Sequence, residues 1–345
     1  MDFDLIMEEI THGLTGDFPT DCSYLKEQME KYKDHEMSKE IIRACGRIMY
    51  EIMPEDKKAE ISKLMQKEDL RIDSTLEEVR FNIYQKNFEK AENIMEALVS
   101  KVDELASTGM YQDDAVSMYF TFSSFFEEIL YVTYNKPEKD VRRSDIPYAE
   151  VYLQYGSLLV DLKRYEDANA AMAKAVRWNP VNAGIAFEYA ETFKLLGDMD
   201  KFFDISKGIF KFAYTPKDVG RCYRNLAFYF VEKKLWSEAI GCNLLSMEFD
   251  RDTPNAPSEL YYIQQVTQGS VKKPSTVEMQ AYSEKYGFPL GADNDVLGIA
   301  FTYGKHFLED NQPDAAKYFL SIVYDLTKDK EIKSLIDQLP SGDNE

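Results

Sequence analysis

Apolar and polar residues follow each other along the chain with the period of amphipathic helices. Between residues 149 and 182 the apolar positions form two stripes: Tyr152, Tyr155, Leu159 and Leu162, then Ala168, Met172, Ala175 and Val176. Positions three or four apart share one face of a helix, so each stripe predicts one helix. The polar stretch DLKRYED between the stripes has the length that joins antiparallel helices. This segment is therefore predicted to be a helical hairpin.

The hairpin pattern repeats along the chain. Gly156 and Ala190 are 34 residues apart, Ala190 and Ala227 are 37 apart, and large and small apolar residues recur in phase with them. Such a fixed period is the signature of a repeat architecture. It gives three successive copies and two weaker ones: 149–182, 183–219 and 220–256, then 72–103 and 297–328.

The sequence also indicates where these helices end and begin. Asn179 precedes Pro180, and a residue before proline is driven out of the helical region, so the second helix should end there. Asn182, Thr215 and Thr253 are predicted N-caps of the helices that follow, the last two with proline in the first helical position.

Two segments outside the period need their own interpretation. Residues 112–134 are apolar over so much of a helical circumference that the predicted helix must be covered on more than one side. Adjacent repeats are the preferred cover, and a partner protein or a second copy of the chain is the alternative. Residues 135–147 are predicted to be a hinge or linker, and no strand-like alternation of useful length appears.

These patterns predict an all-α solenoid, because one hairpin cannot bury its own apolar faces and must stack on its neighbours. Four regions are expected along it. They are an N-terminal helical region, divergent helices with a linker, three repeats, and C-terminal helices with a degenerate copy and a short polar tail: 1–70, 71–146, 147–256 and 257–345.

Composition limits the classes of partner. The 345 residues carry a formal net charge of -20, which repels phosphate backbones and anionic lipid surfaces, so neither nucleic acid nor membrane is an expected partner. The four cysteines show no C-x-x-C spacing and are expected to be reduced and mostly buried. An acidic amino terminus without a secretory pattern favours a cytoplasmic protein.

Catalytic and cofactor motifs are missing from the sequence. His12, His35 and His306 lie far apart and show no metal-binding spacing, and no glycine-rich phosphate loop or nucleophile elbow occurs. We therefore expect no metal, no cofactor and no enzymatic activity; a hydrolase site in the irregular region 257–296 has no motif to support it.

The first copy resembles the tetratricopeptide repeat family in its bacterial form. The places that match the signature in order are Tyr152, Tyr155, Gly156, Tyr165, Ala168, Ala175 and Pro180, and the 34-residue period agrees. The resemblance implies a right-handed α-α superhelix in which the first helix of each hairpin lines a concave groove.

Matching places then give the residues of the implied groove. They are Leu153, Ser157, Phe187, Glu191, Lys194, Arg221, Arg224, Asn225 and Phe228. The implied function is a scaffold or adaptor that binds a peptide or partner protein in this groove. The alternative is a peptide-responsive cytoplasmic regulator that acts on another protein. The oligomeric state is left open.

Arg221 and Arg224 are notable in so acidic a chain. They are three residues apart and share one helix face. A guanidinium pair can grip a partner's carboxylates. The alternative is that the two arginines neutralise internal carboxylates, for which the candidates are Glu188, Glu191 and Glu232.

Overall fold

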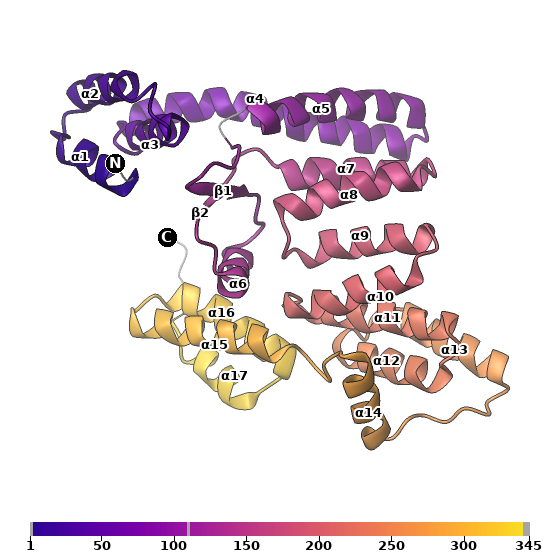
Figure 1. Cartoon of the computed structure of the whole chain (residues 1–345). Helices are drawn as coiled ribbons and strands as arrows, with labels where there is room; N and C mark the ends of the chain where they lie inside the picture. Colours follow the sequence, from indigo (N-terminus) through magenta and orange to yellow (C-terminus); the bar gives the residue numbers. More distant parts are fainter. Residues whose placement is uncertain (1–2, 109–110, 341–345) are drawn as a thin grey trace. The chain divides into compact units, whose positions relative to one another are not determined.

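The computed structural model describes residues 3–108 and 111–340, without the side chains of 59–71 and 108 (Figure 1). The short polar tail predicted at the end of the chain includes residues 341–345, which lie outside the described residues. Contacts divide the chain into two compact units: Met1–Thr121 with Pro137–Leu158, and Phe122–Lys136 with Leu159–Glu345. They are called unit 1 and unit 2 below. The division into four regions made from the sequence stays a prediction.

Unit 1 is mainly helical. Its helices are α1 (Phe3–His12), α2 (Phe18–Lys31), α3 (Ser38–Glu51), α4 (Glu55–Tyr84), α5 (Phe88–Thr108) and most of α7 (Tyr148–Asp161). The first three helices enclose a small core of aliphatic side chains with one thiol: Ile6, Ile10, Leu25, Ile41 and Cys45. Helices α4 and α5 pack against each other as a hairpin.

Unit 1 also contains two strands, which corrects the helix predicted over 112–134. Strand β1 (Ser117–Phe120) pairs in parallel with β2 (Asp140–Arg143), which lies inside the predicted linker. The Asp114 carboxylate accepts hydrogen bonds from the backbone N–H groups of Val116 and Ser117, at 2.9 and 2.7 Å. Such local side-chain bonds draw the backbone away from a helix, and the aromatic residues that follow suit a strand.

The helical part of that apolar segment begins later and belongs to unit 2. Helix α6 (Phe125–Asn135) is capped by Ser124, whose Oγ accepts from the Glu127 N–H at 3.1 Å. Phe126 is fully buried, and its ring centroid lies 5.7 Å from that of Phe319 and 5.2 Å from that of Tyr214. Other helices of the same chain therefore cover this face, which agrees with the preferred interpretation.

Unit 2 holds the remaining helices, and most neighbours in sequence pack against each other (Figure 1). They are α8 (Tyr165–Trp178), α9 (Ala183–Leu195), α10 (Met199–Gly208), α11 (Pro216–Glu232), α12 (Trp236–Phe249), α13 (Asn255–Thr267), α14 (Thr276–Tyr286), α15 (Asn294–Glu309), α16 (Pro313–Thr327) and α17 (Lys330–Asp337), with a 3-10 turn η1 (Ile209–Lys211) after α10. One hydrophobic core, rich in aromatic rings, runs through the helices from α9 to α17.

The hairpin turns repeat one backbone conformation. A residue with positive φ stands in each of five turns: Lys86, Lys163, Gly197, Lys234 and Asn311. Lys163 and Gly197 are 34 positions apart and Gly197 and Lys234 are 37 apart, the same intervals as in the sequence period. The next N–H bonds back to a carbonyl five residues earlier, as from Arg164 to Leu159 at 2.9 Å. The intervals between the small apolar residues in the sequence are thus also the intervals between successive hairpin turns.

Two of the three predicted N-caps are confirmed. Asn182 Oδ1 accepts from the Ile185 N–H at 2.9 Å, and Thr215 Oγ1 accepts from the Asp218 N–H at 3.2 Å. The third N-cap prediction, Thr253, is wrong. Pro254 occupies the cap position of α13 with a helical φ of -76°, which leaves Thr253 one residue too far from the first free N–H groups.

The fold prediction is confirmed in its main feature. The structure is an array of helical hairpins, and β1 and β2 are the exception within the described residues. All four cysteines are free and three of them are buried; burial raises the pKa of Cys45 to about 11. No helix in the described part of the chain is both long and apolar enough to cross a membrane.

Candidate functional site

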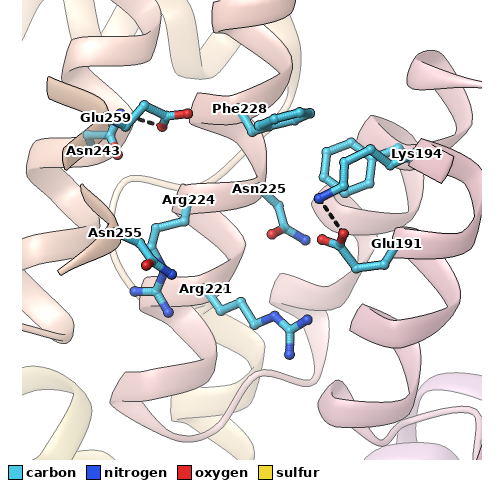
Figure 2. Close-up of a pocket in the computed structure, with 10 residues that line it drawn as sticks. Glu191, Lys194, Arg221, Arg224, Asn225, Phe228, Asn243, Asn255 and Glu259 are labelled. Atoms are coloured by element: carbon cyan, nitrogen blue, oxygen red, sulfur yellow. Dashed lines mark hydrogen bonds and ion pairs between the residues drawn. The ribbon is translucent and has the colours of Figure 1, made fainter. Parts of the chain in front are cut away.

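A cavity of about 450 Å³ lies in unit 2 among the helices that follow residue 182. The first helices of successive hairpins supply most of its lining: Glu191 and Lys194 on α9, Arg221, Arg224, Asn225 and Phe228 on α11, and Asn255 and Glu259 on α13 (Figure 2). Phe202 on α10 and Asn243 on α12 complete it. The four residues of α11 stand at relative positions i, i+3, i+4 and i+7, so one face of that helix is turned toward the cavity.

Lys194 is held in place from three sides. Its ammonium forms an ion pair with Glu191, and the two side chains are 27% and 26% exposed. Its Nζ also lies 4.7 Å from the ring centroid of Phe228 and 5.5 Å from that of Phe202. A cation over an aromatic face is attracted by the ring quadrupole. The cavity therefore has a fixed positive charge between two rings.

Both arginines of α11 are paired with internal carboxylates. Arg221 lies 2.9 Å from Glu188, and its guanidinium stands 4.6 Å from the ring centroid of Phe187. Arg224 bonds to Asp250 at 3.0 Å and to Ser246 Oγ at 3.1 Å. Internal neutralisation was the alternative considered from the sequence. It is confirmed for Arg221 with Glu188, while Arg224 pairs with a residue that was not among the candidates.

Asn243 joins α12 to α13 at the wall of the cavity. Its fully buried side chain donates from Nδ2 to the Ala239 carbonyl at 3.1 Å and to the Glu259 carboxylate at 2.9 Å. Its Oδ1 has no hydrogen-bond partner among the described residues. Burial raises the pKa of Glu259, and the bond from Asn243 and the charge of Lys194 oppose that rise. The wall thus carries one unpaired acceptor and one desolvated carboxyl group.

The cavity collects six of the nine residues predicted for the groove: Glu191, Lys194, Arg221, Arg224, Asn225 and Phe228. Leu153 and Ser157 lie on α7 within unit 1 and are not part of its lining. Phe187 is 1% exposed, so it belongs to the core and supports Arg221 rather than facing a ligand. Its place in the repeat predicted a groove residue, but its ring is covered by neighbouring helices.

Sequence reasoning missed four lining residues. Phe202 and Asn243 stand on second helices, which the resemblance does not place in a groove. Asn255 and Glu259 begin α13, which was assigned to the end of the third copy and to an irregular region. The proline at 254 was the available signal, since it marks the start of another first helix. Within the described residues, no cluster of three or more His, Cys, Asp or Glu side chains is arranged to hold a metal ion.

Comparison with known proteins gives a likeness of fold. No protein-family model matches the chain, and no curated protein sequence matches it. Among solved structures, PilF of Pseudomonas aeruginosa is 12% identical, covers 78% of this chain and 98% of its own, and has a TM-score of 0.41. YrrB, described as a TPR protein with an unusual peptide-binding site, is 12% identical, covers 63% and 100%, and has a TM-score of 0.29. The APC/C hetero-tetramer Cut9-Hcn1 is 13% identical, covers 93% and 70%, and has a TM-score of 0.34.

TM-scores this low carry no argument about the site, so the chain's own hairpins decide the type of fold. Their turns recur at intervals of 34 and 37 residues, and Ala190, Ala227 and Gly304 are buried small residues of first helices. The helical hairpins therefore have the period and the small-residue places that are typical of tetratricopeptide repeats. The cavity lies on the first helices of that array, where the sequence analysis placed the groove.

Proposed function

We propose that the chain is a non-enzymatic adaptor that binds an extended segment of a partner protein in the cavity between α9, α11 and α13. The lining is the observation that carries this proposal. The amide side chains of Asn225, Asn243 and Asn255 stand along the cavity. Each amide oxygen can accept a hydrogen bond from a peptide N–H. Both amide hydrogens of Asn243 are used within the chain, by Ala239 and Glu259, so donors for peptide carbonyls come from the other two amides.

The unpaired Oδ1 of Asn243 supports a ligand that brings a hydrogen-bond donor. A buried acceptor without a partner costs about 1–3 kcal/mol, so a donor that reaches it gains part of that free energy. A peptide N–H is such a donor. A ligand that carries only acceptors would leave the Asn243 Oδ1 unpaired and would not recover that free energy.

The charged groups suggest how the segment is oriented. Arg221 and Arg224 are already engaged with carboxylates, so a partner's carboxylate would have to compete for them. Lys194 is fixed between two rings and is paired with Glu191, so this ion pair presents both signs of charge beside an aromatic surface. We therefore infer that amide and aromatic contacts supply most of the affinity and that the charges set direction and specificity.

Binding to an array of random short peptides tests the proposal. The variants are Lys194→Met and Asn255→Ala, and Lys211→Met is the matched control because Lys211 is exposed and outside the cavity. We expect the wild type and the control to bind the same subset of peptides. The two cavity variants should bind that subset about tenfold more weakly.

Equal binding by wild type and both cavity variants would exclude this cavity as the site. Absence of any peptide selectivity in the wild type would contradict the adaptor function. Circular dichroism of each variant shows that the helices are intact, so a loss of binding can be assigned to the site.

A peptide-responsive regulator of another protein is a second candidate. It is supported by the path of the chain, which passes between the two units at residues 121/122, 136/137 and 158/159. A ligand in unit 2 therefore has several covalent routes by which to affect unit 1. Small-angle scattering with and without a peptide selected from the array is the test; an unchanged profile at saturation would reject this role.

We also propose that the protein acts in the cytoplasm on a protein partner, not on nucleic acid or membranes. A net charge of -20 supports the choice of partner class. Four free cysteines, three of them buried, support a reducing compartment. Cell fractionation with antibody detection checks the location.

A further inference from the structure

A second, larger cavity of about 870 Å³ lies entirely within unit 1. One wall is helix α3, which turns Ile42, Gly46 and Met49 toward the cavity at intervals of four and three residues. The adjacent face of α3 is occupied, because Ile41 and Cys45 are buried in the core with α1 and α2, and Met49 packs against the edge of that core. The cavity therefore lies along the part of this helix that the unit's own core covers only at its edge.

The apolar part of the lining is partly exposed. Ile42 is 38% exposed and Tyr50 is 46% exposed, and Met29 and Met53 extend the same surface. Methionine side chains are flexible and adapt to ligands of different shape. Large apolar side chains left open in a hollow commonly mark a binding surface.

Positive charge surrounds this surface in a chain that is otherwise strongly acidic. Arg43, Arg47, Arg142 and Arg143 all line the cavity, against the carboxylates of Glu51 and Asp145. Arg43 is engaged with Asp114 at 2.9 Å and Arg142 with Asp140 at 2.8 Å. Arg47 differs, because its hydrogen bond goes to the neutral Tyr119 hydroxyl at 3.2 Å and no carboxylate of the described residues pairs with it. Among the described residues, Arg47 is thus a cation with no ion-pair partner beside an apolar hollow.

Strand β2 contributes a backbone edge at the same place. The N–H groups of Asp140 and Ser144 bond to β1, to the carbonyls of Val116 and Phe120, both at 2.8 Å. Alternate residues of a strand direct their backbone groups to opposite edges, so those of Val141 face away from β1. The sheet has two strands, and no described residue pairs with the Val141 backbone. Val141 also lines the cavity.

From these observations we infer that unit 1 binds an extended segment of a partner protein that adds a strand to β2 and carries a carboxylate beside large apolar side chains. The backbone edge at Val141 supplies main-chain hydrogen bonds, the α3 surface receives the apolar side chains, and Arg47 receives the carboxylate. This site is separate in sequence and lining from the cavity of unit 2, and it does not depend on the function proposed there.

The probes for this site are fluorescein-labelled synthetic peptides in which glutamate alternates with leucine or phenylalanine. Fluorescence anisotropy should show saturable binding to the full-length wild type. Arg47→Glu should weaken binding about tenfold or more, and peptides with lysine in place of glutamate should recover binding to that variant. Arg251→Glu is the matched control, since Arg251 is exposed in unit 2 and the change in net charge is the same.

Val141→Pro separates strand addition from simple side-chain docking. Proline removes the outward N–H at 141 and leaves the bonds from Asp140 and Ser144 to β1 in place. It should therefore abolish peptide binding without unfolding the protein, as followed by circular dichroism. Lys194→Met, in the other cavity, should have no effect on these peptides.

Three results would overturn the inference. The first is that the wild type binds the glutamate and lysine peptides with equal affinity, or binds neither of them. The second is that Val141→Pro binds the glutamate peptides as tightly as the wild type. The third is saturable binding of dodecanoate with no binding of the peptides, which would identify a site for a small amphipathic acid instead.

Discussion

Leu320 packs directly over Gly304, so that a Cβ on Gly304 would lie 2.9 Å from the Leu320 Cγ. This contact joins α15 to α16 at the small-residue place of the last hairpin. Such a distance is below ordinary van der Waals contact, and one of the two helices would have to shift. The absence of a side chain at 304 is therefore what allows these helices to approach.

Substitution at this place should be destabilising. We expect Gly304→Ala to lower the free energy of unfolding by about 1–3 kcal/mol, because overpacking at a tight contact outweighs the better helix propensity of alanine. Gly298→Ala on the same helix is the control. A Cβ at 298 would meet no packed neighbour within 4 Å, so alanine there should stabilise by about 1 kcal/mol. Urea unfolding of both variants measures the difference, and a stabilised Gly304→Ala would refute the packing argument.

Glu127 is expected to fix helix α6 to the loop between α8 and α9. Glu127 is 1% exposed, and its carboxylate accepts from the side-chain amides of Asn179 and Asn182, both at 2.8 Å. Glu127→Ala should lower the free energy of unfolding by about 3 kcal/mol, since it leaves these amide donors without that acceptor. Thr133→Ala, on the exposed side of α6, should change it by less than about 0.5 kcal/mol. Similar effects of the two variants in thermal unfolding would contradict this role.

The two arginines of α11 should contribute differently to the free energy of unfolding. The side chains of Arg224 and Asp250 are 16% and 13% exposed, whereas those of Arg221 and Glu188 are 34% and 40% exposed. Arg224→Ala leaves a largely buried carboxylate unpaired and should cost about 3 kcal/mol. Arg221→Ala removes a more exposed pair and should cost about 1 kcal/mol or less. Denaturant midpoints measured in the same buffer give the comparison. A larger loss of stability in Arg221→Ala than in Arg224→Ala would contradict this prediction.

The pH dependence of stability should reveal the desolvated carboxyl group of Glu259. Burial raises its pKa in the folded state. The contribution of Glu259 to the free energy of unfolding is therefore complete below the ordinary glutamate pKa and is lost as the pH rises through the raised folded-state pKa. Glu259→Gln removes that loss and can still accept from Asn243. We expect the variant to gain stability relative to wild type between about pH 5 and about pH 8.

Glu278 provides a control of opposite sign. Hydrogen bonds from Ser275 lower its pKa, so its contribution is present at higher pH and lost as the pH falls. Its contribution to the free energy of unfolding is therefore complete above about pH 5, and Glu278→Gln should lose stability relative to wild type only as the pH rises from about 3 to about 5. Between about pH 5 and about pH 8 the difference between Glu278→Gln and wild type should stay constant, whereas Glu259→Gln should gain. Urea unfolding at about pH 3, 5 and 8 measures both differences, and a Glu278→Gln difference that changes above about pH 5 would contradict this assignment.

The repeat and most of the residues that line the unit 2 cavity could be predicted from the sequence alone. Small residues 34 and 37 positions apart are enough to predict stacked hairpins, because only small side chains allow the helices to approach. The matching places on first helices then located Lys194, Arg224 and Asn225 on one cavity. This worked because helical spacing is a local property that neighbours in sequence fix.

Features that depend on distant residues became visible only in the folded chain. The strand over 117–120 forms because β2 and the Asp113 and Asp114 side chains satisfy its backbone. Pairing of Arg224 with Asp250 and the burial of Phe187 depend on which helix faces which, and helical periodicity does not specify that. The same holds for Glu259 and Asn243, whose roles come from the contact of α13 with α12. Local pattern fixes each helix, but burial and pairing belong to the packed array.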